Sequence, residues 1–195
     1  MTPKKLIAAL AFAGASMLAV SAHADTYEID GQHAWVTFTI KHGIYGIAHG
    51  QFDAVKGAIV MDKADVTKSS VKAEIDVGSV HTAFEQRDSD LKGPDFFNAA
   101  EFPTISFEST KVEKVDDKTG KVTGNLTISG VGKEITLDVK LINEAPAPWD
   151  ATLTKAAFSA TAKLSAADFP MAKAADGFGL GPEVDVVIDL EAVKK

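Results

Sequence analysis

Few side chains in this sequence could carry chemistry. Four of the five histidines lie after residue 24, at His33, His42, His49 and His81. Their spacing matches no compact metal-ligand signature, and no His-Glu-x-x-His motif occurs. The chain also has no cysteine and no Gly-x-Ser-x-Gly motif, so two common kinds of catalytic nucleophile are missing. The residue types therefore favour a binding protein over an enzyme, and they predict no metal site.

His42 is a candidate for contact with a polar group of a ligand. It ends an alternating segment that starts at Trp35, and the alternation places it on the same face as Val36, Phe38 and Ile40. If this face points into a cavity, the imidazole could hydrogen-bond a ligand oxygen near the mouth. The alternative is a histidine whose ring is satisfied by a backbone carbonyl.

Residues 79–110 interrupt the alternating pattern. Thr82 and Glu85 match a capping box, which predicts a short helix that runs through Leu91. Gly93-Pro94 then ends the helix, because glycine adopts the conformations of a helix end and proline cannot continue a helix. An aromatic cluster in this stretch either lines a cavity or fills a core: Phe96, Phe97, Phe102 and Phe107.

Arg87 lies in this predicted helix close to Asp88 and Asp90, and the three could be read as a catalytic cluster. The structural interpretation is that they pair with one another and cap nearby backbone, which would hold the helix against the rest of the fold. Arg87 is also, with His42, a candidate for contact with an anionic headgroup, because a guanidinium binds such groups through paired hydrogen bonds.

The first 24 residues have the organisation of a secretory signal peptide. Two lysines make a basic start, residues 6–20 form an apolar run, and Ala22-His23-Ala24 is an A-x-A cleavage site. The apolar run is shorter than the about 20 residues of a transmembrane helix. We predict cleavage after Ala24, a location in the periplasm, no transmembrane segment in the mature form, and one domain over residues 25–195.

The composition argues against two classes of partner. The 195 residues include 27 acidic and 20 basic side chains, for a net charge of −7. This acidic balance argues against nucleic acid as a partner and against electrostatic docking on anionic lipid headgroups. Without cysteine the fold has no disulfides and must depend on its core.

Eight segments alternate apolar and polar residues, which is the pattern of strands with one buried face. Between them, residues 42–52 read as a glycine-rich loop or irregular strand edge, 144–152 as a proline-rich loop, and 165–182 as a loop with a short helical turn. The alternating segments are residues 35–42, 55–61, 71–77, 104–107, 122–128, 135–141, 158–164 and 184–190.

Antiparallel strands that each bury one face are most simply closed into an up-and-down barrel, which leaves no free edges. The alternative is a two-sheet sandwich. We predict an all-β fold, an eight-stranded antiparallel barrel with a short helix at one end. Small inward residues favour an internal cavity, unless large neighbours fill the space: Gly57, Ala73, Gly124, Ala160 and Ala162.

An ordered set of motifs resembles the YceI-like family. It begins with Tyr27-x-Ile29-Asp30-x-x-His33 and Phe38-x-Ile40-Lys41-His42. Its most specific part runs from Arg87-Asp88-x-Asp90-Leu91 through Asp95-Phe96-Phe97 to Phe102-Pro103-x-Ile105-x-Phe107. So many motifs in the same order make chance agreement a poor explanation.

The resemblance implies a lipocalin-like barrel in which a hydrophobic channel holds the tail of a polyisoprenoid or similar amphiphile, such as an isoprenoid quinone or a polyprenyl phosphate, with no other cofactor. It also implies a periplasmic binding or carrier protein and, by analogy, a homodimer. We predict that the following side chains bind the ligand: Val36, Phe38, Ile40, His42, Phe52, Ile59, Ile75, Val77, Leu91, Phe96, Phe97, Phe102, Ile105, Phe107, Leu126, Ile128 and Phe169.

Two other functions stay open at this point. The barrel could be the scaffold of a secreted stress or interaction protein without a dedicated ligand, and a packed interior with an exposed apolar patch near Phe96 and Phe97 would favour that. An enzyme acting on a bound lipid would instead need an inward polar cluster around His42 with perturbed pKa values.

Overall fold

The structure is a computed structural model that describes residues 24–195, so the predicted signal peptide lies outside the described residues except for Ala24. Within this range, no helix is long and apolar enough to cross a membrane.

The strands are β1 (Asp25–His42), β2 (Gly46–Phe52), β3 (Val55–Met61), β4 (Ser70–Asp76), β5 (Val80–His81), β6 (Thr104–Lys114), β7 (Thr119–Ile128), β8 (Val131–Ala147), β9 (Asp150–Ser165) and β10 (Leu180–Lys194). The helices are α1 (Glu85–Lys92) and α2 (Ala172–Gly177), with short 3₁₀ turns η1 (Val66–Lys68), η2 (Val77–Ser79) and η3 (Ala166–Asp168).

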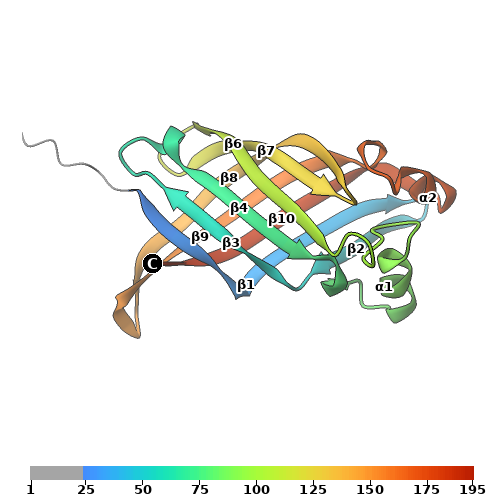
Figure 1. Ribbon diagram of the computed structural model, residues 1–195, viewed down its shortest axis with the longest axis horizontal. Helices are drawn as coiled ribbons and strands as arrows, with labels where there is room; N and C mark the ends of the chain where they lie inside the picture. The colour runs from blue at the N-terminus through green and yellow to red at the C-terminus, as the bar shows by residue number, and fades with distance from the viewer. Residues whose placement is uncertain (1–23) are drawn as a thin grey trace, which may run out of the picture.

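The sheet closes on itself, because the last strand, β10, pairs antiparallel with β1 along almost its whole length. β2 pairs with the C-terminal half of β1 and β3 with the N-terminal end, so β2 and β3 act as one strand interrupted at Asp53-Ala54. Eight antiparallel strands therefore form a closed barrel, as predicted, and the sandwich alternative is wrong. Figure 1 shows the barrel lying on its side with α1 and α2 at the same end.

Several strands are longer than their alternating segments. β1 begins at Asp25, and residues 46–52 form β2. The predicted proline-rich loop at 144–152 is wrong: β8 runs to Ala147 and β9 begins at Asp150. Pro146 is tolerated there because the β8–β9 ladder becomes irregular immediately after it, near the sheet end. The segment 165–182 was predicted as a loop with one short helical turn, and the structure has two short helical elements there, η3 and α2.

The β7–β8 hairpin has a two-residue turn. Ser129 and Gly130 have φ angles of +48° and +75°. Two consecutive positive φ values characterise the turn whose twist matches that of the flanking strands. Ser129 Oγ also donates to the carbonyl of Phe97, at 2.9 Å, so this turn is tied to the aromatic cluster after α1.

The predicted capping box is wrong. α1 begins at Glu85, after Phe84, and no side chain caps its N-terminus. Thr82 instead donates its hydroxyl to Asp88 Oδ1, at 2.5 Å, and accepts from Arg87 Nε, at 2.8 Å. The hydrogen bonds from Thr82 hold the pKa of Asp88 below its usual range, although burial opposes this. Asp88 and Arg87 bond to the backbone of Thr82, as the structural interpretation expected, and so anchor the helix to the loop before it. The expected pairing of Arg87, Asp88 and Asp90 with one another is wrong: among the described residues Asp90 pairs with Gln86 instead.

An apolar cavity inside the barrel

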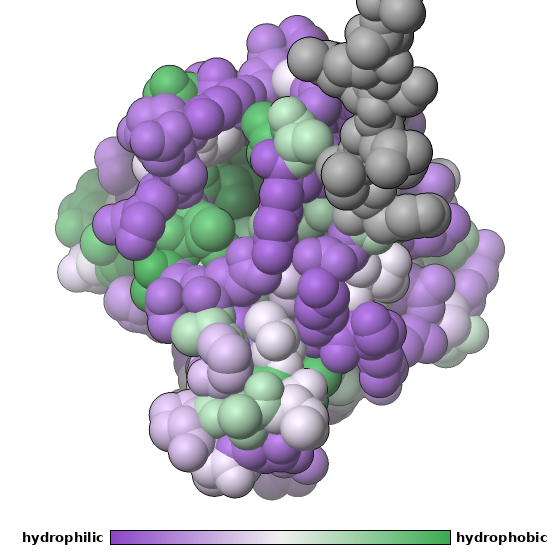
Figure 2. Space-filling view, turned by 90° about the vertical axis from the view of Figure 1, so that its left-hand side faces the viewer, coloured by the Kyte–Doolittle hydropathy of each residue, from purple (hydrophilic) through white to green (hydrophobic). Residues whose placement is uncertain are grey.

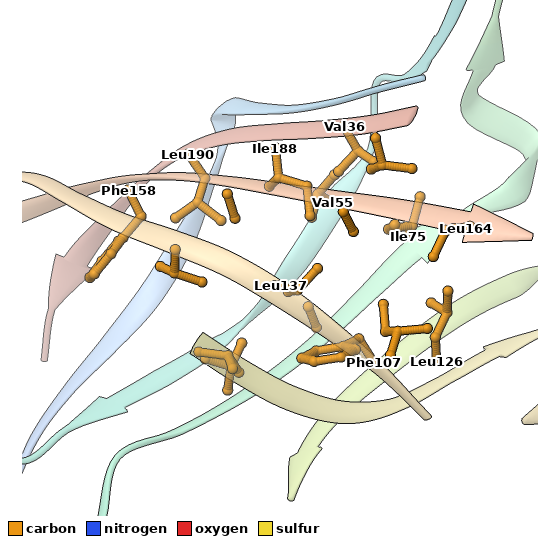
Figure 3. A pocket seen from close by; sticks show the side chains of 18 of the residues that line it. Val36, Val55, Ile75, Phe107, Leu126, Leu137, Phe158, Leu164, Ile188 and Leu190 are labelled. Carbon is orange, nitrogen blue, oxygen red and sulfur yellow. The ribbon is translucent and has the colours of Figure 1, made fainter. Parts of the chain in front are cut away.

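A cavity of about 580 Å³ extends along the inside of the barrel. Each of the eight strands of the wall contributes side chains to it, and Figure 3 shows valine, leucine, isoleucine and phenylalanine side chains converging on it from several strands. The apolar lining follows from the alternation of side chains along a β-strand, in which every second residue faces the same side. In β10, for example, the intervening residues face outward, and the residues that line the cavity are Val184, Val186, Ile188 and Leu190.

Small inward residues help to keep the barrel from filling itself. Ala73, Ala160 and Ala162 line the cavity, as the sequence indicated. Gly124 does not add space in this way, because a Cβ atom there would lie 2.6 Å from Cζ of Phe107. The glycine lets the Phe107 ring lie against β7, so at this position a large neighbour fills the space.

The end of the cavity beside the helices is covered by aromatic rings. Phe52 packs between Phe38 and Phe97, with ring centroids 5.7 and 5.5 Å away. Leu91 of α1 and Phe169, which follows η3, also line this end. Of the aromatic cluster predicted from residues 79–110, only Phe97 is part of this stack of rings, and Phe96 also lines the cavity. Phe107 lies against β7 and Phe102 packs on Gly130.

The other end of the cavity opens between charged turns. Lining residues there come from the β3–β4 and β6–β7 connections and include Lys63, Lys114, Asp117 and Lys118. Figure 2 looks onto this end and shows a hollow lined with hydrophobic residues and framed by hydrophilic ones. We call this opening the charged rim.

A buried tyrosine organises the polar groups of the charged rim. Tyr27 is 0% exposed and donates its hydroxyl to Glu144 Oε1, at 2.6 Å. The pKa of Tyr27 is raised to about 12, mainly by burial and secondly by this hydrogen bond. Lys63 donates to the same oxygen, at 2.5 Å, and that bond raises the pKa of Lys63. Burial raises the pKa of Glu144, but the bonds from Lys63 and Tyr27 outweigh it and leave the pKa below its usual range.

Most of the residues predicted to bind a ligand lie on the cavity wall. Their position makes contact with a ligand feasible, and the contact itself stays a prediction. These wall residues are Val36, Phe38, Ile40, Phe52, Ile59, Ile75, Leu91, Phe96, Phe97, Ile105, Phe107, Leu126, Ile128 and Phe169.

His42 is not on the cavity wall, although it continues the alternation of β1. In the pairing of β1 with β10, Ile40 pairs with Val184 and His42 pairs with Leu180, so the register shifts between these two positions. The irregularity leaves the His42 side chain exposed at the end of the strand. Contact of this histidine with a headgroup stays a prediction that the geometry does not favour.

Arg87 is also off the wall, because its Nη2 donates to the carbonyl of Thr82, at 2.6 Å, and its guanidinium lies over the Phe84 ring. Val77 is 1% exposed but lies in η2, beyond the end of β4, where it packs in the core. The Phe102 ring packs on Gly130 of the β7–β8 turn, outside the cavity.

The sequence prediction missed the part of the wall that β8, β9 and β10 supply. Their inward faces were visible as alternating segments of the predicted barrel, but apart from the small residues of β9 their side chains were not included among the predicted wall or ligand-binding residues. It also missed the rim residues Lys63 and Glu144, the second of which was placed in a loop. The added wall residues from these three strands are Ile135, Leu137, Val139, Leu141, Phe158, Leu164, Val184, Val186, Ile188 and Leu190.

Asp30, His33 and Glu191 bring possible metal ligands within 4.8 Å of one another on the outside of the barrel. Lys155 Nζ lies 3.1 Å from Asp30 Oδ2 and 2.5 Å from Glu191 Oε2. A lysine ammonium therefore already supplies the positive charge that these two carboxylates need.

Together, the closed antiparallel barrel and its apolar interior define a lipocalin-like barrel protein. A family profile described as the YceI-like domain matches residues 27–192 of this chain. The chain therefore belongs to the YceI-like family, as its motifs indicated.

Relatives and solved structures agree with this assignment. "Protein YceI" of Escherichia coli O157:H7 is 37% identical over 98% of this chain and 99% of its own length, and a "UPF0312 protein" of Pseudomonas aeruginosa (strain LESB58) is 36% identical over the same shares. Burkholderia cenocepacia BcnA superposes with a TM-score of 0.74 at 21% identity, covering 84% of this chain and 98% of that one. A polyisoprenoid binding domain from Saccharophagus degradans has a TM-score of 0.60 at 17% identity and covers 87% of this chain and 98% of its own. At these identities the two structures are evidence for the fold.

Proposed function

We propose that this chain is a periplasmic binding or carrier protein that holds the tail of a polyisoprenoid or similar amphiphile, such as an isoprenoid quinone or a polyprenyl phosphate, in the barrel cavity. The observation that carries the proposal is the cavity of about 580 Å³, which is apolar along the barrel. Its volume is in the range of pockets that enclose small ligands. The description of the Saccharophagus degradans domain as polyisoprenoid binding supports the choice of ligand class.

Energetics favours reversible carriage over permanent storage. Moving a tail of roughly 40 carbons out of water would gain about 30 kcal/mol, at about 0.8 kcal/mol for each CH₂. Observed affinities do not go beyond about −21 kcal/mol, and the tail of a membrane lipid is already out of water. Transfer from a bilayer into the cavity is therefore close to neutral, which lets a carrier both load and unload.

The scaffold alternative has less support. A packed interior would favour it, whereas this barrel contains a cavity that Phe96 and Phe97 line, half-buried. The exposed ring of Phe178 does pack on Phe96, so an exposed apolar surface near these residues is present together with the cavity. Our proposal includes no reaction, and the polar groups Tyr27, Lys63 and Glu144 at the charged rim are engaged with one another. The homodimer implied by the family resemblance stays a prediction, which light scattering coupled to size-exclusion chromatography can check.

The test compares a phenylalanine placed inside the barrel with one placed outside it. Ala160 of β9 is 7% exposed and lines the cavity, whereas the next residue, Thr161, faces outward and is exposed. We expect Ala160→Phe to weaken binding of ubiquinone at least about tenfold, because the ring occupies volume that the tail needs. Partition of ubiquinone between the protein and detergent micelles measures this.

Thr161→Phe is the matched control, and we expect it to change ubiquinone binding by less than about twofold. Circular dichroism and thermal unfolding establish that both variants are folded. Equal affinities for the two variants, or no measurable binding by the unaltered protein, would contradict the proposal.

A further inference from the structure

An exposed apolar surface lies at the helical end of the barrel. In the turn between β1 and β2, Ile44 is 93% exposed and Tyr45 is 87% exposed. Ile47, at the start of β2, and Phe178, between α2 and β10, are 62% and 67% exposed. We call these four residues the apolar tip.

The two parts of the apolar tip lie side by side. The backbone N–H of Gly43, in the β1–β2 turn, donates to the carbonyl of Gly179, the residue after Phe178, at 2.7 Å. Figure 1 shows the β1–β2 connection beside α2, at the end opposite the charged rim. The exposed side chains therefore form one surface rather than isolated positions.

The charge around the apolar tip differs from that of the whole molecule. The chain has 27 acidic residues, yet residues 31–52, which include the whole β1–β2 turn, contain neither aspartate nor glutamate. Lys41 pairs across the strands with Ile47, so an ammonium group is carried beside an exposed aliphatic side chain. On the side of Phe178, α2 carries one exposed basic residue, Lys173, and one exposed acidic residue, Asp176. The sequence around the apolar tip therefore lacks the acidic excess of the whole chain, and Lys41 adds a favourable interaction with anionic lipid.

The apolar tip is continuous with the cavity. The ring of Phe178 lies 5.8 Å from that of Phe96, between centroids, and Phe96 lines the cavity. β2 pairs with β1 along its length but with β5 only at Gln51 and Phe52. Among the described residues, the rest of that edge of β2 has no ladder partner, so side chains rather than backbone hydrogen bonds cover the barrel there.

We propose that the apolar tip docks on a phospholipid surface and that the lipid ligand moves between this surface and the cavity beside the free edge of β2. Aliphatic side chains enter the boundary of the acyl region, tyrosine sits at headgroup level, and lysine is attracted to anionic lipid. The proposal of docking depends only on the residues of the apolar tip, whereas the proposal of ligand transfer rests on the function proposed above.

The test of docking uses vesicles of phosphatidylethanolamine and phosphatidylglycerol that contain no isoprenoid. We expect the protein to float with the vesicles, and the double variant Ile44→Ser/Tyr45→Ser to reduce partitioning at least about tenfold, because binding scales with the apolar area that is inserted. Phe178→Ser should act in the same direction.

Trp149→Ser is the matched control, because Trp149 is 73% exposed at the opposite end of the barrel, next to Asp150. This control should keep its vesicle binding. Failure of the unaltered protein to float, or an equal loss in Trp149→Ser, would overturn the docking proposal. It would also be overturned if light scattering showed that the double variant converts a dimer into a monomer, because the apolar tip would then be a subunit interface.

Two further measurements separate docking from ligand binding. Affinity for ubiquinone in detergent micelles should be the same in the double variant and the unaltered protein, whereas extraction of ubiquinone from vesicles should slow by at least about tenfold in the variant. A lower affinity of the double variant in micelles, together with slower extraction from vesicles, would contradict a docking role. Absence of ubiquinone binding in both proteins, with vesicle flotation intact, would contradict the proposed function and leave docking supported.

Discussion

Tyr27 joins the barrel wall to the charged rim. Its ring is fully buried between strands, and its hydroxyl donates to Glu144, which also accepts from Lys63. Both donors are needed because a carboxylate at the edge of an apolar cavity has lost part of its hydration. The three residues therefore fix the ends of β1, β3 and β8 relative to one another.

This arrangement predicts a specific alkaline loss of stability. The pKa of Tyr27 is raised from 10.0 to about 12 in the folded protein, so its contribution is complete below pH 10 and is lost as the pH rises towards 12. The free energy of unfolding should fall by about 2–3 kcal/mol over that interval through Tyr27 alone. Urea unfolding as a function of pH measures it.

The control for this prediction is Tyr27→Phe, which keeps the ring and removes the titrating group. Its stability should be lower than that of the unaltered protein near neutral pH, and the difference should shrink between pH 10 and 12. A difference that is constant with pH would contradict the account of Tyr27.

Single positions could be predicted from the sequence where they follow the alternation of a strand interior. Val36, Phe38 and Ile40 lie on the cavity wall for that reason. His42 and Phe102 do not, because a register shift and a hairpin turn determine where their side chains go. Neither feature leaves a periodic signal in the sequence.

At the scale of elements, α1 is held mainly by its charged side chains. α1 has no buried residue. Asp88 accepts from both the backbone N–H and the hydroxyl of Thr82, at 2.7 and 2.5 Å, while Arg87 donates to the hydroxyl and carbonyl of the same residue. Because Thr82 is only 8% exposed, its polar groups depend on these partners rather than on water.

We therefore expect Asp88→Ala to destabilise the α1 segment by about 1–3 kcal/mol, the cost of leaving buried donors unpaired. Amide hydrogen exchange should accelerate in residues 84–99, and exchange in the barrel strands should change little. Asp90→Ala is the control, since Asp90 is exposed and, among the described residues, its carboxylate accepts only from the side-chain amide of Gln86, at 2.9 Å. Equal exchange in the two variants would show that Asp88 does not anchor the helix.

Most strands could be predicted from alternation, but their ends could not. β8 and β9 extend into the predicted loop at 144–152, because cross-strand pairing outweighs the unfavourable local preference of Pro146, whereas Pro148 lies in the turn between the two strands. The capping box at Thr82 failed for a similar reason: the same hydroxyl had tertiary partners in Asp88 and Arg87. A local motif indicates which hydrogen bonds a side chain can form, but the tertiary contacts determine which of them it does form.

At the scale of the molecule, closure of the sheet creates the cavity. Pairing of β10 with β1 turns eight apolar faces inward, and small residues such as Ala73 and Ala160 leave space between them. The two ends of this cavity differ: one opens between charged turns, and the other is covered by aromatic rings next to the apolar tip. This difference between the two ends fits the amphiphilic ligand and the membrane docking that we propose.

Native mass spectrometry of the protein purified from its own source, followed by organic extraction of whatever accompanies it, tests the central claim most directly. We predict a single adduct with the mass of an isoprenoid-tailed lipid, and the adduct should be missing in Ala160→Phe. A mixture of fatty acids would contradict the isoprenoid assignment. A bare polypeptide that also fails to bind added quinone would contradict lipid carriage itself.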